Sequence, residues 1–530
     1  MLERWTSAAS ASADAGLADV CLVLEGTYPF VAGGVSSWVH RVIHELPELR
    51  FSILHISPAA GYYEARAYEV PDNVIGVDEV YLHETSTLRG GLEALRMRRV
   101  AADFARFVGD LRRGELGGFE AMVASLQKSK LRHRTNLLVN RLNWSGIVDE
   151  FREDATDESF LNFFWNWYYA HQPLLNVLAT RLPRASVYHT ISTGYAGVLA
   201  AAAGAHHERP VLLTEHGIYT KERRIEIHAA EWIQDRVHDE LAVQNQAPFF
   251  RRFWNRHFET MSRICYERAA AIFTLYMGNA KEQIKDGADP AKIRVIPNGI
   301  SLERFEVGAE RFATREANRR FTVGFVGRVC PIKDVRTLIA ATRVVKDQVP
   351  DVLVRILGPM EEDPEYAEEC QKLASALDLD ANVRFEGRVA VHDVMPELDL
   401  LVLTSISEAQ PLVILEAGAV GLPIVATDVG SCRELLNGRT PEDRALGMGG
   451  LITPIASPGA TGRAILELFA DESLRRAMGR SLQARVRRFY DERFMIDAYR
   501  SIYYEHIADE VDFVASDQEV HTVSACGGQA

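Results

Sequence analysis

The chain has 530 residues, of which 47% are hydrophobic and 25% charged, as in soluble globular proteins. We expect two large domains, because a single hydrophobic core rarely organises more than about 300 residues. The 73 acidic residues outnumber the 59 basic ones and give a net charge of -14, which argues against general nucleic-acid binding, since that function favours a basic surface.

The six cysteines are scattered without a Cys-x-x-Cys pair, so we expect neither a structural zinc site nor a disulfide framework. The amino terminus carries an acidic residue, Glu3, and has no apolar core region, so it does not resemble a signal peptide. No apolar run reaches the roughly 18 residues that a spanning helix needs. These features predict a cytoplasmic protein and leave open a peripheral place at the inner face of the cell membrane.

The first half of the chain alternates strand and helix patterns, which is typical of a parallel sheet with helical crossovers. An apolar run at 19–24 predicts a strand, followed by a turn at Gly33 and Gly34 and a helix at 38–46. Further strands are expected at 51–56, 185–190, 211–214, 271–275 and 294–298.

A charged and aromatic region between about residues 60 and 170 interrupts the strand pattern, and we expect a mostly helical insertion there. Its aromatic run at 160–169 is expected to pack between helices. A surface for sugar rings or for a partner protein is the alternative.

The second half repeats the alternation, with strands expected at 321–326, 352–357, 383–385, 398–404 and 424–427. The stretch from Glu306 to Arg320 is polar and marks the domain boundary. We therefore expect a first domain over 1–310, a second over 311–490, a terminal helix over 491–512 and a disordered tail over 513–530.

Two glutamates eight residues apart, Glu408 and Glu416, are the most informative pair in the chain. Residues 398–404 are typical of a buried strand, and Pro411 is well suited to open a helix. Glu408 therefore lies in a turn at the carboxyl end of a strand, where ligands bind and where helix amides suit a diphosphate. The carboxylates would accept hydrogen bonds from ribose and hexose hydroxyls. Two solvated surface glutamates are the alternative, but small residues at 417–421 leave that helix little polar face.

The positive charge that a diphosphate needs lies upstream. The strand at 321–326 runs into a glycine turn at Gly327 and Arg328, and Lys333 follows five residues after Arg328. An arginine fork and a lysine charge would neutralise a diphosphate and stabilise it as a leaving group. Either cation alone is as readily a surface residue as a ligand-binding one. The two cations together with both glutamates favour a binding site.

His216 and the glycine pair are weaker signals. His216 follows an apolar strand, where a histidine is as readily a structural hydrogen-bonding residue as a catalytic one. Gly33 and Gly34 allow a phosphate or sugar to approach the backbone closely, although such a pair is more often only a tight turn.

The Glu-x7-Glu pattern, with Gly327-Arg328 and Lys333, resembles the retaining family-four glycosyltransferases of the GT-B fold. Motifs in the first half resemble the PelF-type enzymes of bacterial exopolysaccharide synthesis, and the similarity runs from about residue 18 to about residue 508. These motifs are Glu25-Gly-Thr-Tyr-Pro-Phe-Val-Ala-Gly-Gly-Val-Ser-Ser-Trp38, His171-Gln-Pro173, Ser192-Thr-Gly-Tyr-Ala-Gly197 and Thr214-Glu-His-Gly-Ile-Tyr-Thr-Lys-Glu-Arg223.

The resemblance implies an α/β protein with two Rossmann-like, doubly wound domains facing across a cleft, and a last helix that crosses back onto the first domain. It implies a retaining enzyme that moves a hexose or N-acetylhexosamine from a UDP-sugar donor to a growing polysaccharide acceptor. Membrane-embedded exopolysaccharide synthase subunits are the implied partners, and nucleic acid is not expected.

The resemblance also implies roles for individual residues. Glu408 would orient the hexose hydroxyls, Glu416 would hold the ribose, and Arg328 with Lys333 would draw off the nucleoside diphosphate. His216 would line the reaction centre, and Gly33 with Gly34 would form a loop over the donor. Groups near Arg388, and after Pro411 at Leu412 and Val413, would receive the base and phosphates. The expected acceptor-side neighbours are Glu215, Tyr219, Glu222 and Arg223.

Metal use and competing functions follow from the same residues. The Asp-x-Asp of Asp378 and Asp380 falls where a helix is expected to end, so we interpret it as surface charge and predict metal-independent chemistry without a cofactor. A glycoside hydrolase also needs paired carboxylates, but Arg328 and Lys333 argue against it. A UDP-sugar-binding scaffold subunit and a sugar-nucleotide epimerase stay as alternatives.

Overall fold

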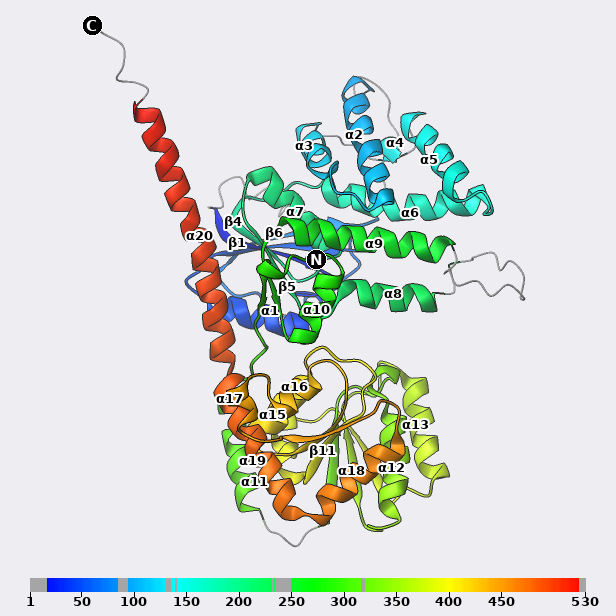
Figure 1. The fold of residues 1–530 in the computed structure, drawn as a ribbon, viewed down its shortest axis with the longest axis vertical. Coiled ribbons are helices and arrows are strands. Elements are labelled where there is room, and N and C mark those ends of the chain that lie inside the picture. The colour runs from blue at the N-terminus through cyan, green and yellow to red at the C-terminus, as the bar shows by residue number, and fades with distance from the viewer. Residues whose placement is uncertain are drawn as a thin grey trace, which may run out of the picture. The chain divides into compact units, whose positions relative to one another are not determined.

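The computed structural model describes residues 17–83, 94–129, 135–138, 141–230, 233, 249–315 and 320–523. The chain divides into two compact units (Figure 1). Unit 1 comprises residues 1–274, 280–294 and 499–530, and unit 2 comprises residues 275–279 and 295–498. Of the described helices, none combines the length and the apolar character that crossing a membrane requires.

Unit 1 is built on a seven-stranded sheet in the order β3-β2-β1-β4-β5-β6-β7. Neighbouring strands from β3 to β6 pair in parallel. The strands are β1 (Ala18–Glu25), β2 (Phe51–Ser57), β3 (Val74–Tyr81), β4 (Ala185–Thr190), β5 (Val211–Glu215), β6 (Ala269–Thr274) and β7 (Ile293–Val295). The strand order reverses between β1 and β4, and the carboxyl ends of strands at such a reversal form the usual ligand site of a doubly wound sheet.

The predicted insertion is mostly helical, but it begins with a strand that the sequence analysis missed. Strand β3 forms an edge of the sheet, and most of its side chains are not buried. An edge strand needs no continuous apolar run, so it lacks the pattern by which the inner strands were recognised. The insertion helices, blue to cyan in Figure 1, are α2 (Ala94–Arg113), α3 (Phe119–Ser129), α4 (Thr135–Leu138), α5 (Arg141–Asp154) and α6 (Phe160–Leu178).

The aromatic run at the start of α6 divides between core and surface. Phe163 and Trp167 are buried, as expected from packing between helices. Trp165 and Tyr169 are exposed and stack on each other, with ring centroids 5.7 Å apart. The prediction that this run packs between helices therefore holds for only part of it, because residues four apart share one face of a helix and the two pairs lie on different faces.

The remaining helices of the first half are α1 (Gly34–Glu45), α7 (Tyr195–His207), α8 (Tyr219–Ala229), α9 (Phe249–Arg268) and α10 (Met277–Lys285), with a short 3-10 turn at Pro290–Lys292. Helix α1 begins four residues earlier than predicted, directly at Gly34.

Unit 2 repeats the same topology with six strands in the order β10-β9-β8-β11-β12-β13. They are β8 (Thr322–Val326), β9 (Leu353–Leu357), β10 (Val383–Gly387), β11 (Leu400–Leu403), β12 (Ile424–Thr427) and β13 (Gly450–Thr453), all paired in parallel. Successive residues of β11 enter different apolar clusters: Leu400 and Val402 join one, Leu401 and Leu403 the other. The sheet is therefore buried on both faces, which explains why its strands are continuous apolar runs. Strand β13, a four-residue edge strand, was missed, although the edge strands β7 and β10 were predicted.

The helices of unit 2 cover both faces of its sheet (Figure 1). They are α11 (Glu306–Thr314), α12 (Val335–Lys346), α13 (Pro364–Ala376), α14 (Val391–Val394), α15 (Leu412–Val420), α16 (Cys432–Asn437), α17 (Pro441–Arg444), α18 (Pro458–Ala470) and α19 (Glu472–Phe489), with 3-10 turns at Glu303–Phe305, Pro331–Lys333 and Met395–Glu397. The polar stretch expected as the domain boundary contains α11, which packs on α15, so unit 2 begins at Val295 rather than at 311.

Helix α20 (Glu492–Val523), the long red helix of Figure 1, belongs to unit 1 from Tyr499 onward. It continues past residue 513, where the sequence predicts a disordered tail. No glycine or proline occurs between Glu492 and Val523 to end the helix. Residues 524–530 of the predicted tail, like 1–16, lie outside the described residues.

Two tyrosines hold α20 to the sheet of unit 1. Tyr503 OH lies 2.7 Å from His189 Nδ1, His189 Nε2 lies 2.9 Å from Thr214 Oγ1, and Tyr499 OH lies 2.8 Å from the same Thr214 oxygen. All four side chains are buried, and burial lowers the pKa of His189 to about 3. The ring is therefore neutral near pH 7, so one of its nitrogens donates and the other accepts.

We expect Tyr503→Phe to lower the free energy of unfolding by about 1–3 kcal/mol, because it leaves a buried ring nitrogen of His189 without its partner. Chemical denaturation of the variant beside the wild type measures the change. Tyr504→Phe is the matched control, since Tyr504 is the next residue and is exposed. Equal losses in the two variants would contradict the docking role of Tyr503.

Candidate functional site

Lys333 and Glu408 form an ion pair at the carboxyl edge of the unit 2 sheet. The distance between Lys333 Nζ and Glu408 Oε1 is 2.5 Å, and the side chains are only 19% and 11% exposed. They meet because β8 and β11 are adjacent at the reversal of strand order, so the loops that follow these strands lie together. The Ser405 hydroxyl donates to the same oxygen of Glu408 at 2.7 Å. The structure thus brings together two residues that are 75 positions apart.

The loop that carries Glu408 is held by the turn after β12. Gly430 has a φ of 51°, and a Cβ at that position would lie 2.3 Å from the carbonyl oxygen of Glu408. The Ser431 amide donates to the Ala409 carbonyl at 2.9 Å, and the Thr427 hydroxyl donates to the Ser405 carbonyl at 2.6 Å. Sequence reasoning recognised this turn but not its contact with the loop, because contacts between strands are not encoded locally.

Arg328 follows β8 directly but contacts neither glutamate of the predicted set among the described residues. Its Nη1 pairs with Glu362, and the two side chains are 52% and 48% exposed. An exposed pair of this kind contributes little stability. A phosphate could therefore replace Glu362 as the partner of Arg328 at small cost.

Glu416 is the fifth residue of α15 and is partly buried. Burial raises the pKa of its carboxyl group, and the Arg304 charge opposes that rise. The small residues around it serve packing: a Cβ on Gly418 would lie 2.6 Å from Val486 Cγ2 of α19. The small residues thus let α15 and α19 approach closely. The sequence pattern did not reveal this reason for their presence.

The amides that open α15 and the residue after β10 complete the predicted donor set. Pro411 is the N-cap of α15, and the first helical amides are those of Leu412 and Val413. Helix geometry leaves such amides without an intrahelical partner. Arg388 is exposed at the carboxyl end of β10, the outermost strand on that side of the sheet. Arg388 thus lies at the carboxyl ends of the strands, as Lys333 and Glu408 do, and β10 is two strands away from β8.

His216 follows β5 at the carboxyl edge of the unit 1 sheet and is buried. Burial lowers the pKa of its imidazole to about 4. The ring packs edge-on against Trp38, with centroids 4.9 Å apart. A neutral imidazole cannot balance phosphate charge near pH 7, but it can exchange hydrogen bonds with hydroxyl groups.

Glu25 and Arg223 form a second polar group at the same edge of unit 1. Glu25 ends β1, and its Oε2 accepts from the Ala196 amide at 3.4 Å. Burial raises the pKa of Glu25, and the Arg223 charge opposes the rise. The Arg223 guanidinium lies over the Tyr219 ring, 5.0 Å from its centroid, and pairs with Glu226 at 2.6 Å. Sequence reasoning noted Glu25 only within a motif; its place at the end of a buried strand was the available signal.

Three further predicted residues of unit 1 are Glu222, Gly33 and Gly34. Burial raises the pKa of Glu222, which lies in the first turn of α8. Gly33 and Gly34 precede and open α1, and a Cβ on either would meet nothing within 4 Å. No protein atom therefore requires glycine at these positions, and the space above them is open.

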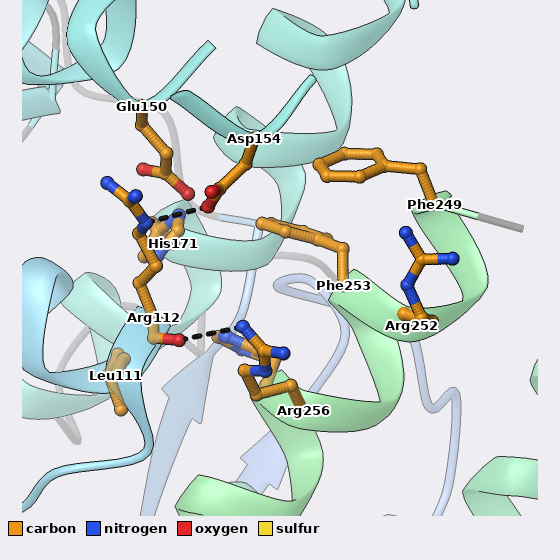
Figure 2. Close-up of a pocket in the computed structure, with 10 residues that line it drawn as sticks. Leu111, Arg112, Glu150, Asp154, His171, Phe249, Arg252, Phe253 and Arg256 are labelled. Carbon is orange, nitrogen blue, oxygen red and sulfur yellow. Dashed lines mark hydrogen bonds and ion pairs between the residues drawn. The ribbon is translucent and has the colours of Figure 1, made fainter. Parts of the chain in front are cut away.

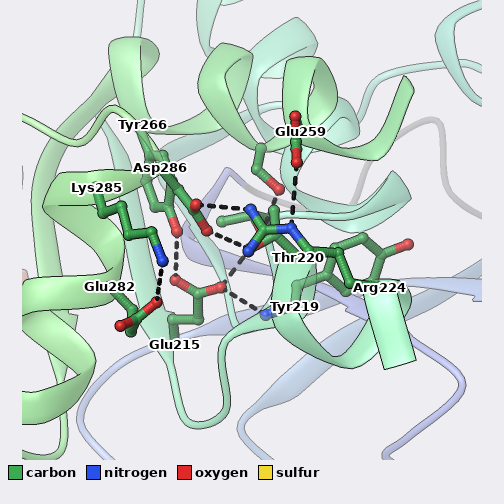
Figure 3. Close-up of polar contacts among 11 residues, drawn as sticks. Glu215, Tyr219, Thr220, Arg224, Glu259, Tyr266, Glu282, Lys285 and Asp286 are labelled. Carbon is green, nitrogen blue, oxygen red and sulfur yellow. Dashed lines mark hydrogen bonds and ion pairs between the residues drawn. The ribbon is translucent and has the colours of Figure 1, made fainter. Parts of the chain in front are cut away.

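Glu215 is a structural residue rather than an acceptor-side contact (Figure 3). Its Oε1 accepts from the Tyr219 amide at 3.1 Å and the Thr193 hydroxyl at 3.3 Å. Its Oε2 accepts from the Tyr266 hydroxyl at 2.8 Å and the Gln283 amide at 2.9 Å. These four bonds use the hydrogen-bonding capacity of a carboxylate. The side chain is buried, so the expected ligand role is replaced by a framework role.

Asp378 and Asp380 follow the end of α13, as the sequence indicated. Asp380 accepts from the Ser375 hydroxyl at 2.6 Å, and the Asp378 carbonyl accepts from Lys346. Within the described part of the chain, no three His, Cys, Asp or Glu residues are grouped so that they could hold a metal ion.

Two family models match the chain. Residues 18–291 match the one described as a domain of unknown function (DUF3492), and residues 307–485 match the one described as glycosyl transferases group 1. The second match contains Arg328, Lys333, Glu408 and Glu416.

Curated relatives include D-inositol 3-phosphate glycosyltransferases. The one from Corynebacterium urealyticum is 28% identical over 264 residues, which cover 45% of this chain and 59% of the relative. The one from Streptomyces scabiei is 34% identical over 155 residues, which cover 27% of this chain and 35% of the relative. The chain thus spans only part of the length of the curated relatives it matches.

Solved structures with the same fold include Anabaena Alr3699/HepE in complex with UDP, at a TM-score of 0.55 and 14% identity. Sucrose-phosphate synthase from Thermosynechococcus elongatus has a TM-score of 0.55 and 16% identity. Each likeness covers 92% of this chain and 99% of the other. The predicted fold class, two Rossmann-like α/β units of the GT-B kind, is confirmed.

Proposed function

The chain belongs to the DUF3492 family and carries a glycosyl transferases group 1 domain, and from this premise we propose that it is a UDP-sugar-dependent glycosyltransferase. It moves a hexose or N-acetylhexosamine, with retention of configuration, to a growing bacterial exopolysaccharide of the Pel type. Synthase subunits in the membrane are the proposed partners, and the protein works on the cytoplasmic side of that membrane.

The Lys333–Glu408 pair at the reversal of strand order carries this proposal. The pair places a cation and an acceptor carboxylate together, 2.5 Å apart and largely shielded from water. A donor offers complementary groups, since its diphosphate needs a cation and its sugar hydroxyls need acceptors. The diphosphate can take Lys333 while the hydroxyls take Glu408, so both charges stay compensated when the donor binds.

The remaining residues of unit 2 complete the donor chemistry. Arg328 and Lys333 stabilise the charge that develops on the departing nucleoside diphosphate, which is the main electrostatic demand of the transfer. The amides that open α15 receive phosphate oxygens. Glu416 accepts from the ribose hydroxyls, and Arg388 assists at the base.

The acceptor side of the reaction is assigned to unit 1. There, neutral His216 exchanges hydrogen bonds with hydroxyl groups of the transferred sugar. The acceptor meets an acidic group in Glu25, a basic group in Arg223 and an apolar ring in Tyr219. Retention requires the acceptor hydroxyl to attack from the face that the diphosphate leaves.

A uridine nucleotide is favoured because Anabaena Alr3699/HepE was solved with UDP and with UDP-glucose. We expect calorimetry to show binding of UDP-sugars and not of GDP-sugars. Arg328→Ala should weaken that binding about 10- to 100-fold, because a charged hydrogen bond contributes about 1.5–3 kcal/mol.

Arg336→Ala is the matched control for Arg328→Ala. Arg336 lies in the same unit, is 53% exposed and pairs with exposed Glu369, as Arg328 does with Glu362. Equal binding by the two variants would remove Arg328 from the site. Absence of nucleotide binding by the wild type would contradict the proposed function. Binding of a UDP-sugar without turnover would favour the UDP-sugar-binding scaffold, and conversion of the donor to an isomeric sugar nucleotide without acceptor would favour an epimerase.

A further inference from the structure

A pocket in unit 1 lies between α9 and the insertion helices, and none of the residues assigned above lines it (Figure 2). Its volume is about 170 Å³. The lining comes from the end of α2, from α5, from α6 and from one face of α9. Since the insertion helices are additions to the sheet, this pocket needs its own explanation.

His257 presents a buried polar atom to this pocket. The side chain is only 5% exposed, and its Nε2 has no hydrogen-bond partner among the described residues. Leaving such an atom unsatisfied costs about 1–3 kcal/mol. Burial lowers the pKa of His257 to about 3, so the ring is neutral near pH 7. A hydroxyl group of a ligand could donate to Nε2 or accept from it.

Three arginines (Arg112, Arg252 and Arg256) and two carboxyl groups (Glu150 and Asp154) line the pocket. Arg112 Nε pairs with Asp154 at 2.7 Å, and Arg256 Nη1 donates to the Arg112 carbonyl at 3.1 Å (Figure 2). Among the described residues no carboxylate pairs with Arg256, which leaves donors for a ligand. Burial raises the pKa of Glu150 to about 7. Guanidinium donors and carboxyl acceptors together suit a ligand with several hydroxyl groups, because each hydroxyl group can both donate and accept.

The pocket also has an apolar wall of the right size. Phe249 and Phe253 lie one turn apart on α9 and stack, with ring centroids 6.4 Å apart. A protein cavity of about 150 Å³ accepts one six-membered ring. The volume here therefore suits one such ring, and a nucleotide would need a larger site. An aromatic wall with convergent polar groups fits a sugar ring, which has an apolar face and polar edges.

We propose that this pocket is a saccharide subsite that holds one neutral pyranose residue, with its apolar face on Phe253 and its hydroxyl groups bonded to Arg256, Asp154 and His257 Nε2. The residue belongs to the glycan that the enzyme extends, and this assignment of the glycan rests on the proposed function. The insertion thereby gives unit 1 a hold on the glycan that is separate from the donor residues of unit 2.

Saturation-transfer NMR on the full chain tests this proposal. The probes are the methyl glycosides of glucose and galactose, N-acetylglucosamine and N-acetylgalactosamine at millimolar concentration, and inorganic phosphate. We expect at least one saccharide to bind the wild type without UDP-sugar present, and phosphate not to compete. Absence of saccharide binding, or displacement by phosphate, would overturn the proposal.

Two variants locate the binding. Arg256→Ala removes an exposed side chain and should not affect folding, whereas His257→Phe keeps an aromatic ring at this position and removes both nitrogens. Each should weaken saccharide binding at least 10-fold and leave UDP-sugar binding unchanged. Arg263→Ala, on the same helix but with its guanidinium on the Gly114 carbonyl, should change neither.

The outcomes separate this proposal from the proposed function. Undiminished saccharide binding by both variants would place the sugar elsewhere and overturn the subsite. Saccharide binding that depends on Arg256, in a protein that binds no UDP-sugar, would support the subsite and remove the transferase function.

Discussion

Glu408→Gln is expected to lower turnover about 10²- to 10³-fold, the range found when one preorganised electrostatic contact is removed from an active site. Glutamine keeps the size of the side chain, and its carbonyl oxygen can still accept from Ser405. It loses the negative charge that pairs with Lys333 and that, on the proposed function, accepts from sugar hydroxyls. Initial rates with a saturating UDP-sugar and a glycan acceptor measure the effect.

Lys333→Met provides the complementary test. It should lower turnover by a similar factor, about 10²- to 10³-fold. It should also weaken the binding of UDP itself, whereas Glu408→Gln should leave UDP binding intact. The reason is that Lys333 serves the diphosphate and Glu408 serves the sugar, which UDP lacks. This difference in UDP binding distinguishes the two roles from a general disturbance of the loop, which would affect UDP binding in both variants.

Loss of a partly buried ion pair can also destabilise the fold, so both variants need a stability control. Glu397→Gln removes a 2.7 Å ion pair with Arg355 in the same unit, and turnover by this variant should equal that of the wild type. The double variant Lys333→Met with Glu408→Gln should melt closer to the wild type than either single variant, because no charge is left unpaired. Normal turnover by both single variants would refute the site assignment.

Arg485→Met is expected to cost about 3–5 kcal/mol of stability, because it leaves a buried carboxylate uncompensated. Arg485 is fully buried on α19, and its Nε pairs with Asp443 at 2.5 Å. Its other nitrogens donate to the Leu436 carbonyl at 2.8 Å and to the Gly447 carbonyl at 2.7 Å. Differential scanning calorimetry should show the loss as a lower transition temperature of unit 2.

Arg476→Ala is the control for Arg485→Met. Arg476 lies on the same helix, but it is exposed and its partner Glu472 is one turn away. Surface pairs of this kind contribute about 0–1 kcal/mol. A similar loss in both variants would mean that the helix itself, and not the buried ion pair, determines the stability of unit 2.

The sequence was sufficient for the inner strands and for the loops that follow them. Strands β8 and β11 are continuous apolar runs because both faces of their sheet are buried, and this pattern is readable without neighbours. The edge strands β3 and β13 were missed, although the edge strands β7 and β10 were predicted. Most side chains of β3 are not buried, so it lacks a continuous apolar run. The same local sequence patterns predicted that Arg328, Lys333 and Glu408 lie in the segments that follow strands.

The sequence by itself thus determined the fold class and the kinds of chemical group at the strand ends, because backbone propensity and apolar pattern are local properties. Only the tertiary structure decided which of these groups can meet a ligand. Glu215 ends an apolar strand and Glu408 follows one. The oxygens of Glu215 accept from four donors, three of which are distant in the chain, whereas Glu408 pairs with a lysine that a diphosphate could bind instead. Likewise, the docking of Tyr503 on His189 and the pocket around His257 join segments far apart in the chain. Such contacts depend on the packing of the whole unit, which no local pattern records.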